Sequence, residues 1–146
     1  VNSLIEENKK LQKELENLNM EKVVSLRKTL IQDAEIVKGV KIITKRIDNE
    51  STESIKDLVF EINKNSKNTI SLLGARFGDK ANLWLMISSN LVDEKGLNAQ
   101  EIIRFIGKDI NGGGGGQAFY ATAGGKNPDG LETALQKGRE FILSKL

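Results

Sequence analysis

The first 37 residues carry the apolar pattern of a long helix. Val1 to Val37 contains no Gly or Pro and consists mostly of strong helix formers, so one continuous helix is predicted. In its first half, apolar residues recur alternately three and four apart, as in the seam of a coiled coil. We interpret this seam as an intermolecular contact that makes a homodimer; the alternative is a helix that covers its own domain. The seam residues are Val1, Leu4, Asn8, Leu11, Leu15 and Leu18.

After Leu18 the apolar face moves to a second register. It continues at Val23, Leu26, Leu30, Ala34 and Val37, and Gly39 follows where a helix is expected to end. We therefore predict that the second half docks on the domain that follows. A polar Asn8 inside the seam favours a defined two-stranded pairing over loose aggregation. The pattern is compatible with both parallel and antiparallel pairing.

Beyond Gly39 the pattern alternates between strands and helices. Strands are predicted at 40–47, 69–73 and 82–88, the last two joined by turn residues Gly78 and Asp79. Helices are predicted after Ser51 or Thr52, after Asn98 and from Asp129, each beginning at a residue that can cap a helix. Trp84 lies within a predicted strand and is assigned to the core.

These elements predict an α/β (α+β) fold. The expected order is α-β-α-β-β-α, a glycine loop, then β-α, with a mixed sheet in a small two-layer domain because one connection is a hairpin. Residues 1–38 form the predicted helical stalk, which dimerises, and residues 39–146 form the predicted globular domain.

Composition narrows the chemistry. The chain has no Cys and no His, which excludes disulfides, thiolate nucleophiles, imidazole bases and most zinc sites. A net charge of +2 permits an RNA partner without requiring one. Apolar runs are too short to cross a bilayer, and we expect a cytoplasmic protein without a membrane partner. No catalytic residue and no metal ligand is assigned.

The glycines concentrate near the C-terminus. Ten of the fourteen follow residue 106, and five stand together. We interpret this run as a functional loop whose amides meet an anion or a ligand; the alternative is a flexible linker. Gly125 and Lys126 precede Asn127, so the P-loop pattern fails. A dinucleotide fingerprint also fails, because the run follows a helix rather than a strand.

From Gly112 the sequence reads GGGGGQAFYATAGGKNPDG, which resembles the glycine-rich signature of the C-terminal domain of bacterial alanyl-tRNA synthetases. A related fold ends the DHH-superfamily phosphoesterases. The preceding stalk and the element order extend the resemblance over the whole chain. It implies a parent enzyme that uses ATP, Mg and Zn to charge tRNA with alanine and to edit it. This chain is expected to need no cofactor and to supply contact with alanine tRNA and dimerisation, without catalysis of its own.

The resemblance also implies a set of RNA-contacting residues. We expect backbone amides and nearby donors to meet phosphates or riboses, and Tyr120 to stack on a base. The residues are Gly112, Gly113, Gly114, Gly115, Gly116, Gln117, Gly124, Gly125, Lys126, Asn127, Lys108 and Arg104, with Tyr120.

Two other functions remain open at this point. One is a nucleotide- or phosphate-binding domain of a DHH-type phosphoesterase, although in that branch a His follows the glycine run where this chain has Gln117. The other is a coiled-coil scaffold with an inert globular cap, which predicts no affinity for RNA.

Overall fold

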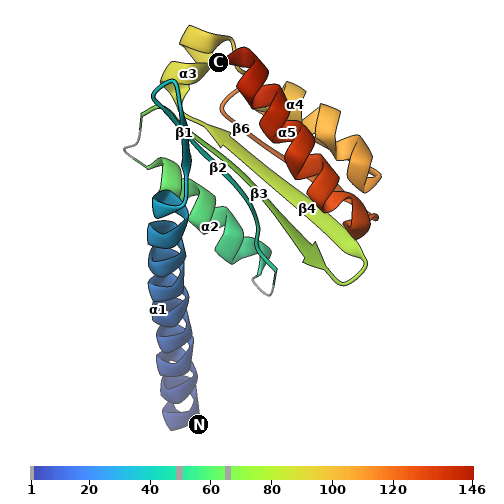
Figure 1. Cartoon of the computed structure of the whole chain (residues 1–146). Coiled ribbons are helices and arrows are strands. Elements are labelled where there is room, and N and C mark those ends of the chain that lie inside the picture. The colour runs from blue at the N-terminus through green and yellow to red at the C-terminus, as the bar shows by residue number, and fades with distance from the viewer. Residues whose placement is uncertain (1, 49–50, 65–66) are drawn as a thin grey trace.

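The structure, a computed structural model, describes residues 2–48, 51–64 and 67–146, so Val1 of the predicted seam lies outside it. A long N-terminal helix leads into a sheet flanked by helices (Figure 1). The elements are α1 Asn2–Gln32, β1 Glu35–Val37, β2 Val40–Arg46, α2 Thr52–Asn63, β3 Thr69–Phe77, β4 Lys80–Ile87, α3 Ser89–Lys95, α4 Ala99–Gly107, the 3-10 turn η1 Lys108–Ile110, β5 Gly112–Gly116, β6 Tyr120–Gly125, the 3-10 turn η2 Pro128–Gly130 and α5 Leu131–Lys145.

The strands form one mixed sheet in the order β1-β2-β3-β4-β6-β5. β2 and β3 are parallel and are connected through α2, whereas the other neighbouring strands in the described part of the chain are antiparallel. A parallel pair needs such a crossover, and a two-residue turn suffices for the β3–β4 hairpin. The predicted α/β class with a mixed sheet and an N-terminal helix is confirmed.

Helices lie on both faces of the sheet, which makes three layers where two were predicted. On one face lie α4 and α5, and on the other lies α2, with the second half of α1 packed against it. The reason is visible in β3, where residues 69–75 are all buried. A strand buried on both faces needs apolar residues at consecutive positions and a layer on each side.

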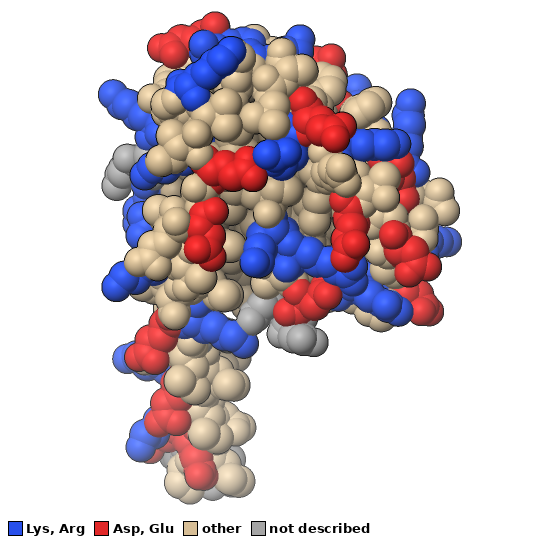
Figure 2. Space-filling model, viewed as in Figure 1, with Lys and Arg blue, Asp and Glu red and all other residues tan. Residues whose placement is uncertain are grey.

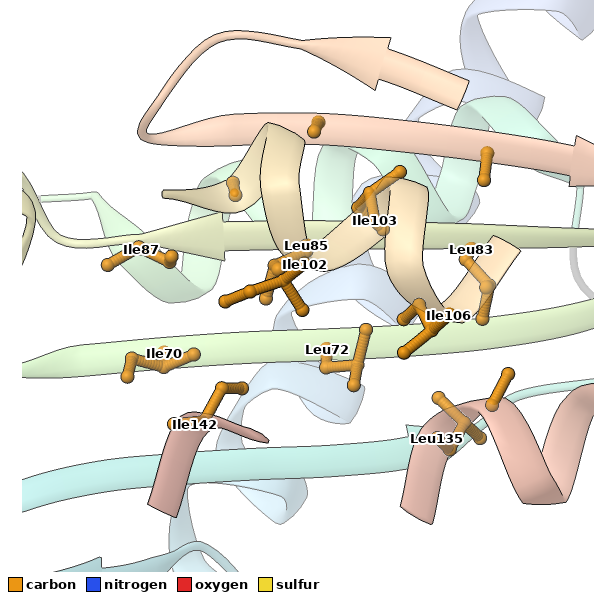
Figure 3. Close-up of a cluster of buried hydrophobic side chains, with 14 of the residues drawn as sticks. Ile70, Leu72, Leu83, Leu85, Ile87, Ile102, Ile103, Ile106, Leu135 and Ile142 are labelled. Atoms are coloured by element: carbon orange, nitrogen blue, oxygen red, sulfur yellow. The ribbon is translucent and has the colours of Figure 1, made fainter. Parts of the chain in front are cut away.

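The larger core lies between the sheet and the helices α4 and α5 (Figure 3). Full burial of an aliphatic side chain contributes about 1.5–3 kcal/mol, so this layer carries much of the stability. The strands supply Ile70, Leu72, Leu83, Leu85 and Ile87, and the helices supply Ile102, Ile103, Ile106, Leu135 and Ile142.

The smaller core lies on the opposite face, under α2. There Trp84 is only 5% exposed and packs edge-on against Phe77 with ring centroids 6.3 Å apart. The predicted place of Trp84 in the core is confirmed. The stripe of α2 that faces the sheet consists of Ile55, Leu58, Val59 and Ile62.

The long helix ends at Gln32, earlier than predicted. Residues 35–37 form β1 instead and return through a two-residue turn in which Lys38 has φ 52° and Gly39 has φ 81°. Two positive φ angles are typical of the tight turns that match the twist of a hairpin. Gly39 is therefore a turn residue and does not end the helix. Ala34 and Val37 continue the apolar spacing of a helix, so the sequence pattern did not indicate the strand of three residues that forms there.

The first half of α1 projects from the globular part as a stalk (Figure 1). The predicted change of register is confirmed at Val23 and Leu30, which are buried against the smaller core. Charged side chains gather along one side of the projecting stalk and leave the other side uncharged (Figure 2).

The helix caps were predicted with mixed success. Ser51 Oγ accepts a hydrogen bond from the Ser54 amide at 3.1 Å, and Asn98 Oδ1 accepts one from the Glu101 amide at 3.2 Å, as expected. Asp129 is not a cap, because residues 128–130 form a 3-10 turn and α5 begins at Leu131. The short helix α3 was not predicted, since it has one buried apolar residue, Leu91.

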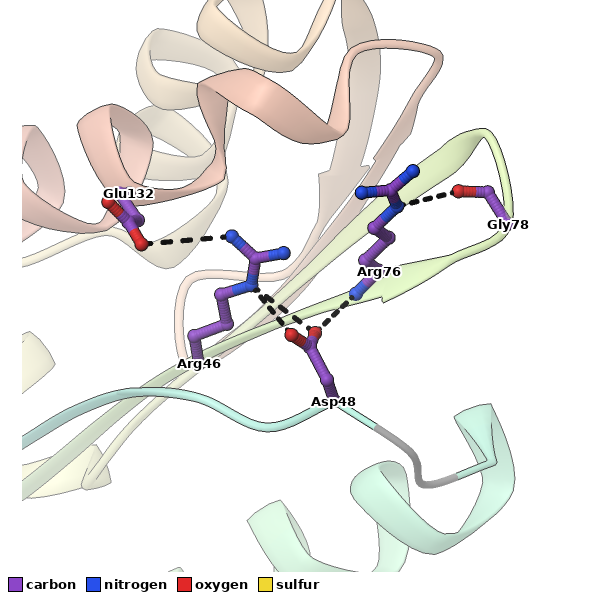
Figure 4. Close-up of polar contacts among 5 residues, drawn as sticks. All are labelled: Arg46, Asp48, Arg76, Gly78 and Glu132. Atoms are coloured by element: carbon purple, nitrogen blue, oxygen red, sulfur yellow. Dashed lines mark hydrogen bonds and ion pairs between the residues drawn. The ribbon is translucent and has the colours of Figure 1, made fainter.

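A cluster of charged side chains lies at the C-terminal ends of β2 and β3 (Figure 4). Asp48 accepts hydrogen bonds from Arg46 Nε, at 3.0 Å to Oδ2, and from the Arg76 backbone amide, at 3.1 Å to Oδ1. Partial desolvation works to raise the pKa of Asp48, but these bonds and the arginine charges outweigh it and lower that pKa. Arg46 Nη1 also lies 3.8 Å from Glu132 Oε1 on α5.

Candidate functional site

The five consecutive glycines form an edge strand rather than the predicted loop. β5 pairs with β6 in antiparallel register, from Gly112 opposite Gly125 to Gly116 opposite Ala121. Glycine gives no alternation of apolar and polar side chains, so nothing in the sequence indicated a strand. The predicted glycines Gly124 and Gly125 lie in β6, directly opposite the start of the run.

Close packing explains why part of this strand excludes side chains. A Cβ on Gly114 would lie 2.3 Å from the Thr122 carbonyl oxygen and 2.7 Å from the Ala123 Cβ. A Cβ on Gly112 would lie 2.1 Å from the Gly124 oxygen, whereas one on Gly113 would meet nothing within 4 Å. Alternate positions therefore press against β6, and Gly113 faces open space.

Helix α4 runs beside the glycine strand. A Cβ on Gly107 would lie 3.4 Å from the Gly112 oxygen, and one on Gly115 would lie 3.9 Å from Gln100 Nε2. Gln100, Arg104 and Lys108 are spaced four apart, so they share a flank of the helix and its continuation. Arg104 and Lys108 are exposed. The structure therefore brings these two predicted donors alongside β5 and adds Gln100, which was not predicted.

The chain after β6 is bound tightly to the turn before β5. The Asn127 amide donates to the Ile110 oxygen at 3.0 Å, and Asn127 Nδ2 donates to the Asp109 oxygen at 3.2 Å. These bonds give Asn127 a structural part in addition to the predicted contact with RNA. Lys126 precedes it and is exposed. Gly130 was not singled out by sequence, yet a Cβ there would lie 1.8 Å from the Asp109 oxygen.

Tyr120 and Gln117 lie at the other end of the glycine strand. The Gln117 amide donates to the Tyr120 oxygen at 2.7 Å, and the Gln117 side chain is exposed. Tyr120 is partly buried on the α2 side of the sheet, where its ring centroid lies 5.0 Å from that of Phe60. Burial raises the pKa of the Tyr120 phenol, so it stays protonated at neutral pH. The structure separates Tyr120 from Lys126 by the length of β6.

A groove runs between α2 and β6. Its helix side contains Thr52, Lys56 and Phe60, which are spaced four apart on one flank, and its strand side contains Tyr120, Thr122 and Gly124. Asn82 and Trp84 of β4 line its floor, and this part encloses about 680 Å³. A second hollow of about 420 Å³ continues past the Phe60–Tyr120 contact and is lined by Phe60, Lys64, Met86 and Phe119, among others. We call the two parts together the α2–β6 groove.

The predicted dimer seam is exposed. Leu4, Leu11, Leu15 and Leu18 are 64%, 51%, 61% and 60% exposed, and Asn8 is exposed with them. Side chains of this size are usually buried, so four of them exposed at heptad spacing are typical of a helix that pairs outside its own domain. Among the described residues, no helix is long and apolar enough to cross a membrane, and no cluster of three acidic side chains is arranged to hold a metal ion.

Comparison with known proteins gives the family of this fold. Residues 39–144 match the DHHA1 domain. The chain belongs to the DHHA1 family. It is similar to the C-Ala domain of Aquifex aeolicus alanyl-tRNA synthetase, with 31% identity and a TM-score of 0.63 over 71% of this chain and 92% of that one.

Curated relatives of this chain include alanine–tRNA ligases. The chain is 44% identical over 142 residues to the ligase of Christiangramia forsetii and 37% identical over 139 residues to that of Cytophaga hutchinsonii. It spans 16% of the length of each and matches them over 97% and 95% of its own length. The predicted relationship to the C-terminal region of alanyl-tRNA synthetases is confirmed, and it extends through the stalk.

A second solved structure shares only the fold with this DHHA1 domain. It is a DHH domain from a protein described as a member of a family of ribosomal proteins, and it aligns with 85% of this chain at a TM-score of 0.57 and 15% identity. At 15% identity the structural similarity shows a shared fold and supports no statement about function.

Sequence reasoning missed the α2–β6 groove of this DHHA1 domain. Phe60 and Lys56 are exposed residues on a helix and read as an ordinary solvated surface. The signal that distinguishes them is tertiary, since β6 approaches from about 60 residues further along the chain. Phe60 in the middle of an otherwise polar flank is the one local indication.

Proposed function

We propose that this chain is the tRNA-contacting and self-associating module of an alanyl-tRNA synthetase. It supports charging and editing by holding alanine tRNA and by pairing two subunits. The observation that carries the proposal is the glycine edge strand, which presents backbone without side chains next to the exposed Arg104, Lys108 and Lys126. The relatives named alanine–tRNA ligase support the choice of RNA. The ATP, Mg and Zn chemistry of the parent enzyme belongs, in this proposal, to other segments.

The RNA contact has a physical basis in the edge strand. β5 has β6 on one side only, and edge strands present backbone amides and carbonyls that lack a strand partner. Backbone amides and lysine or arginine side chains are the usual donors to phosphate oxygens. Without side chains on β5, a sugar-phosphate backbone can approach these amides closely.

A salt titration tests RNA binding. Alanine tRNA is titrated at several salt concentrations, with a plain RNA duplex of equal charge as competitor, and a preference for folded tRNA supports the module. Lys126→Gln should weaken binding to every RNA and reduce the salt slope by about one unit, because one phosphate contact is lost. Lys28, exposed on α1 at the other side of the sheet, supplies the matched control Lys28→Gln.

Equal affinity for duplex and tRNA would reject recognition of tRNA by this chain alone. An unchanged slope in Lys126→Gln would remove Lys126 from the contact. Unchanged slopes in Lys126→Gln and in the matching Arg104 and Lys108 variants would reject the glycine edge as the RNA surface.

Self-association rests on the exposed seam of α1. Leu15→Lys places a charge in the seam and should shift the chain toward monomer in sedimentation velocity. Asn17→Lys adds the same charge to the same helix, away from the seam, and should leave the oligomeric state unchanged. A wild-type chain that sediments as a monomer at high micromolar concentration would reject the dimer. Equal behaviour of the two variants would reject the seam.

A further inference from the structure

Two clusters of exposed aromatic rings stand out on the surface. Phe60 and Phe119, 41% and 45% exposed, lie along the α2–β6 groove beside Tyr120. On the other side of the sheet, Phe105 of α4 is 47% exposed, and its ring centroid lies 5.7 Å from that of Phe141 on α5. The first cluster differs from the second because it lies at a concave surface that also contains polar groups.

Polar groups line the same groove as the rings. Thr122 precedes Gly124 on the strand side, two residues beyond Tyr120, and Asn82 pairs with Gly124 in the sheet register. A Cβ on Gly124 would lie 3.0 Å from Asn82 Oδ1. Glycine at this position therefore leaves the Asn82 amide uncovered, and that amide offers both donors and an acceptor.

Two lysines and two glutamates of α2 line the groove, so its net charge is balanced. Lys56 lies one turn before Phe60 on the groove flank, and Lys64 lies one turn after it. Asp57 lies on the opposite flank, facing α1, while Glu53 and Glu61 line the groove together with the lysines. The two lysines therefore bracket the aromatic ring on the side that faces β6.

We propose that the α2–β6 groove is a stacking site for an unpaired nucleobase of the bound RNA. Phe60 and Tyr120 supply the aromatic faces, Asn82 and Thr122 meet the edge of the base, and Lys56 meets a phosphate. Unpaired bases are recognised by aromatic stacking combined with hydrogen bonds at the base edge, and lysine side chains bind the neighbouring phosphates. The volume of about 680 Å³ lies within the range of about 300–1,000 Å³ typical of ligand sites.

This inference rests on the proposed function and deepens it. The glycine edge and its donors hold the RNA backbone, whereas the groove on the α2 side takes a base. The two surfaces meet at β6, which pairs with β5 and also lines the groove. One RNA that reaches both must present an unpaired base within a few nucleotides of the contacted phosphates.

The protein contains its own reporters for the test. Its single Trp and single Tyr, Trp84 and Tyr120, both line the groove. Alanine tRNA, a short unpaired RNA oligonucleotide and an RNA duplex of equal charge are titrated while intrinsic fluorescence is recorded. The tRNA and the unpaired oligonucleotide should quench the emission, and the duplex should not, because its bases are already stacked.

Aromatic variants separate stacking from charge. Phe60→Leu and Tyr120→Leu should each weaken tRNA binding roughly five- to a hundredfold, as expected for one stacked base, with an unchanged salt slope. Tyr120→Phe should bind like wild type because the ring remains. Phe105→Leu removes an equally exposed ring on the opposite side and is the matched control. Circular dichroism confirms that each variant is folded.

The outcomes distinguish this inference from the function on which it rests. Normal tRNA affinity in folded Phe60→Leu and Tyr120→Leu, with a reduced slope in Lys126→Gln, overturns the stacking site and leaves the RNA-binding module standing. Loss of self-association in the aromatic variants, with RNA affinity retained, identifies the groove as a protein contact and also overturns it. If wild-type protein fails to bind tRNA, both proposals fall.

Discussion

The two edges of the sheet are held in different ways. β1 pairs with β2, and side chains of β1 and its turn hold it in addition: Arg139 Nη2 and Nε donate to Glu35 Oε2 at 2.8 and 3.0 Å, and Lys38 Nζ donates to the Leu146 oxygen at 2.8 Å. β5 has no side chains and is fixed by backbone pairing with β6 and by the close approach of α4. An edge held by side chains tolerates changes of single atoms, whereas an edge held by backbone packing does not.

This difference fits the part that each edge has in the proposed function. Charged side chains on β1 and its turn protect an exposed edge from pairing with other strands. β5 keeps its backbone accessible, which an RNA-contacting surface requires, and it is only five residues long. Variants of the two edges should therefore differ in how much they lower the free energy of unfolding and in how that change depends on salt and pH.

The largest effect is expected from Gly114→Ala. The new methyl group would overlap the backbone of β6, so the free energy of unfolding should fall by about 1–3 kcal/mol. Gly113→Ala is the matched control. It adds the same methyl group where space is open, and stability should stay constant or rise by up to about 1 kcal/mol. Urea unfolding followed by Trp84 fluorescence measures both, and equal losses would contradict the packing of β5.

At the opposite edge, Gly39→Ala should lower stability by about 1 kcal/mol. The space around Gly39 is open, but its φ of 81° is unfavourable for a residue with a Cβ. Gly39→Asn should lose less, because Asn tolerates the left-handed region. Thermal unfolding compares the two variants. A larger loss in the Asn variant would show that space rather than backbone conformation limits this turn.

A smaller change in stability is expected when acid protonates Asp48. The pKa of Asp48 is lowered in the folded state, so its contribution to stability is present at neutral pH and is lost as the pH falls below about 4. Asp48→Asn should therefore lower stability at pH 7 by no more than about 1 kcal/mol, since the pair is partly exposed. The difference from wild type should shrink toward about pH 3. Asp79→Asn, the same replacement in the exposed turn of the β3–β4 hairpin, is the matched control.

The smallest effect is expected from Glu35→Gln. Both partners of the Glu35–Arg139 pair are substantially exposed, and exposed pairs contribute from a few tenths of a kcal/mol up to about 1 kcal/mol. In high salt the free energy of unfolding of the wild type should approach that of the variant, because salt screens the Glu35–Arg139 pair. Glu140→Gln, on the exposed surface of α5, is the control. A loss as large as that of Gly114→Ala would remove the contrast between the edges.

The interior of the fold was predictable from sequence because β3, β4 and the buried stripes of α2 and α4 carry long apolar patterns. Both edges were missed. β1 contains only three residues, among them exposed Glu35 and Ile36, and it continues a helical spacing. β5 contains glycine alone, which has no side-chain period. Edge strands bury few side chains, so the pattern that identifies inner strands is absent from them.

The candidate site was predictable in composition and only partly in geometry. The glycines, Arg104, Lys108 and Lys126 do lie together around β5, although their contact with RNA stays a prediction. Tyr120 lies at the other end of β6 from Lys126, and its ring packs on the α2 side of the sheet. The α2–β6 groove depends on α2 crossing over β4 and lying beside β6, which no local pattern specifies.

The stalk fixes direction as well as reach. α1 runs without Gly or Pro from the exposed leucines to the buried Val23 and Leu30. Its length therefore sets both the distance and the rotation angle between the seam and the globular part. Each residue of a helix adds about 1.5 Å and turns about 100°. An insertion of two residues near position 20 would swing one paired domain through roughly 200° about the stalk axis relative to the seam, whereas seven residues would lengthen the stalk by about 10 Å and nearly restore the original direction. In the proposed dimer, the angular phase of α1 therefore sets which way the two glycine edges face.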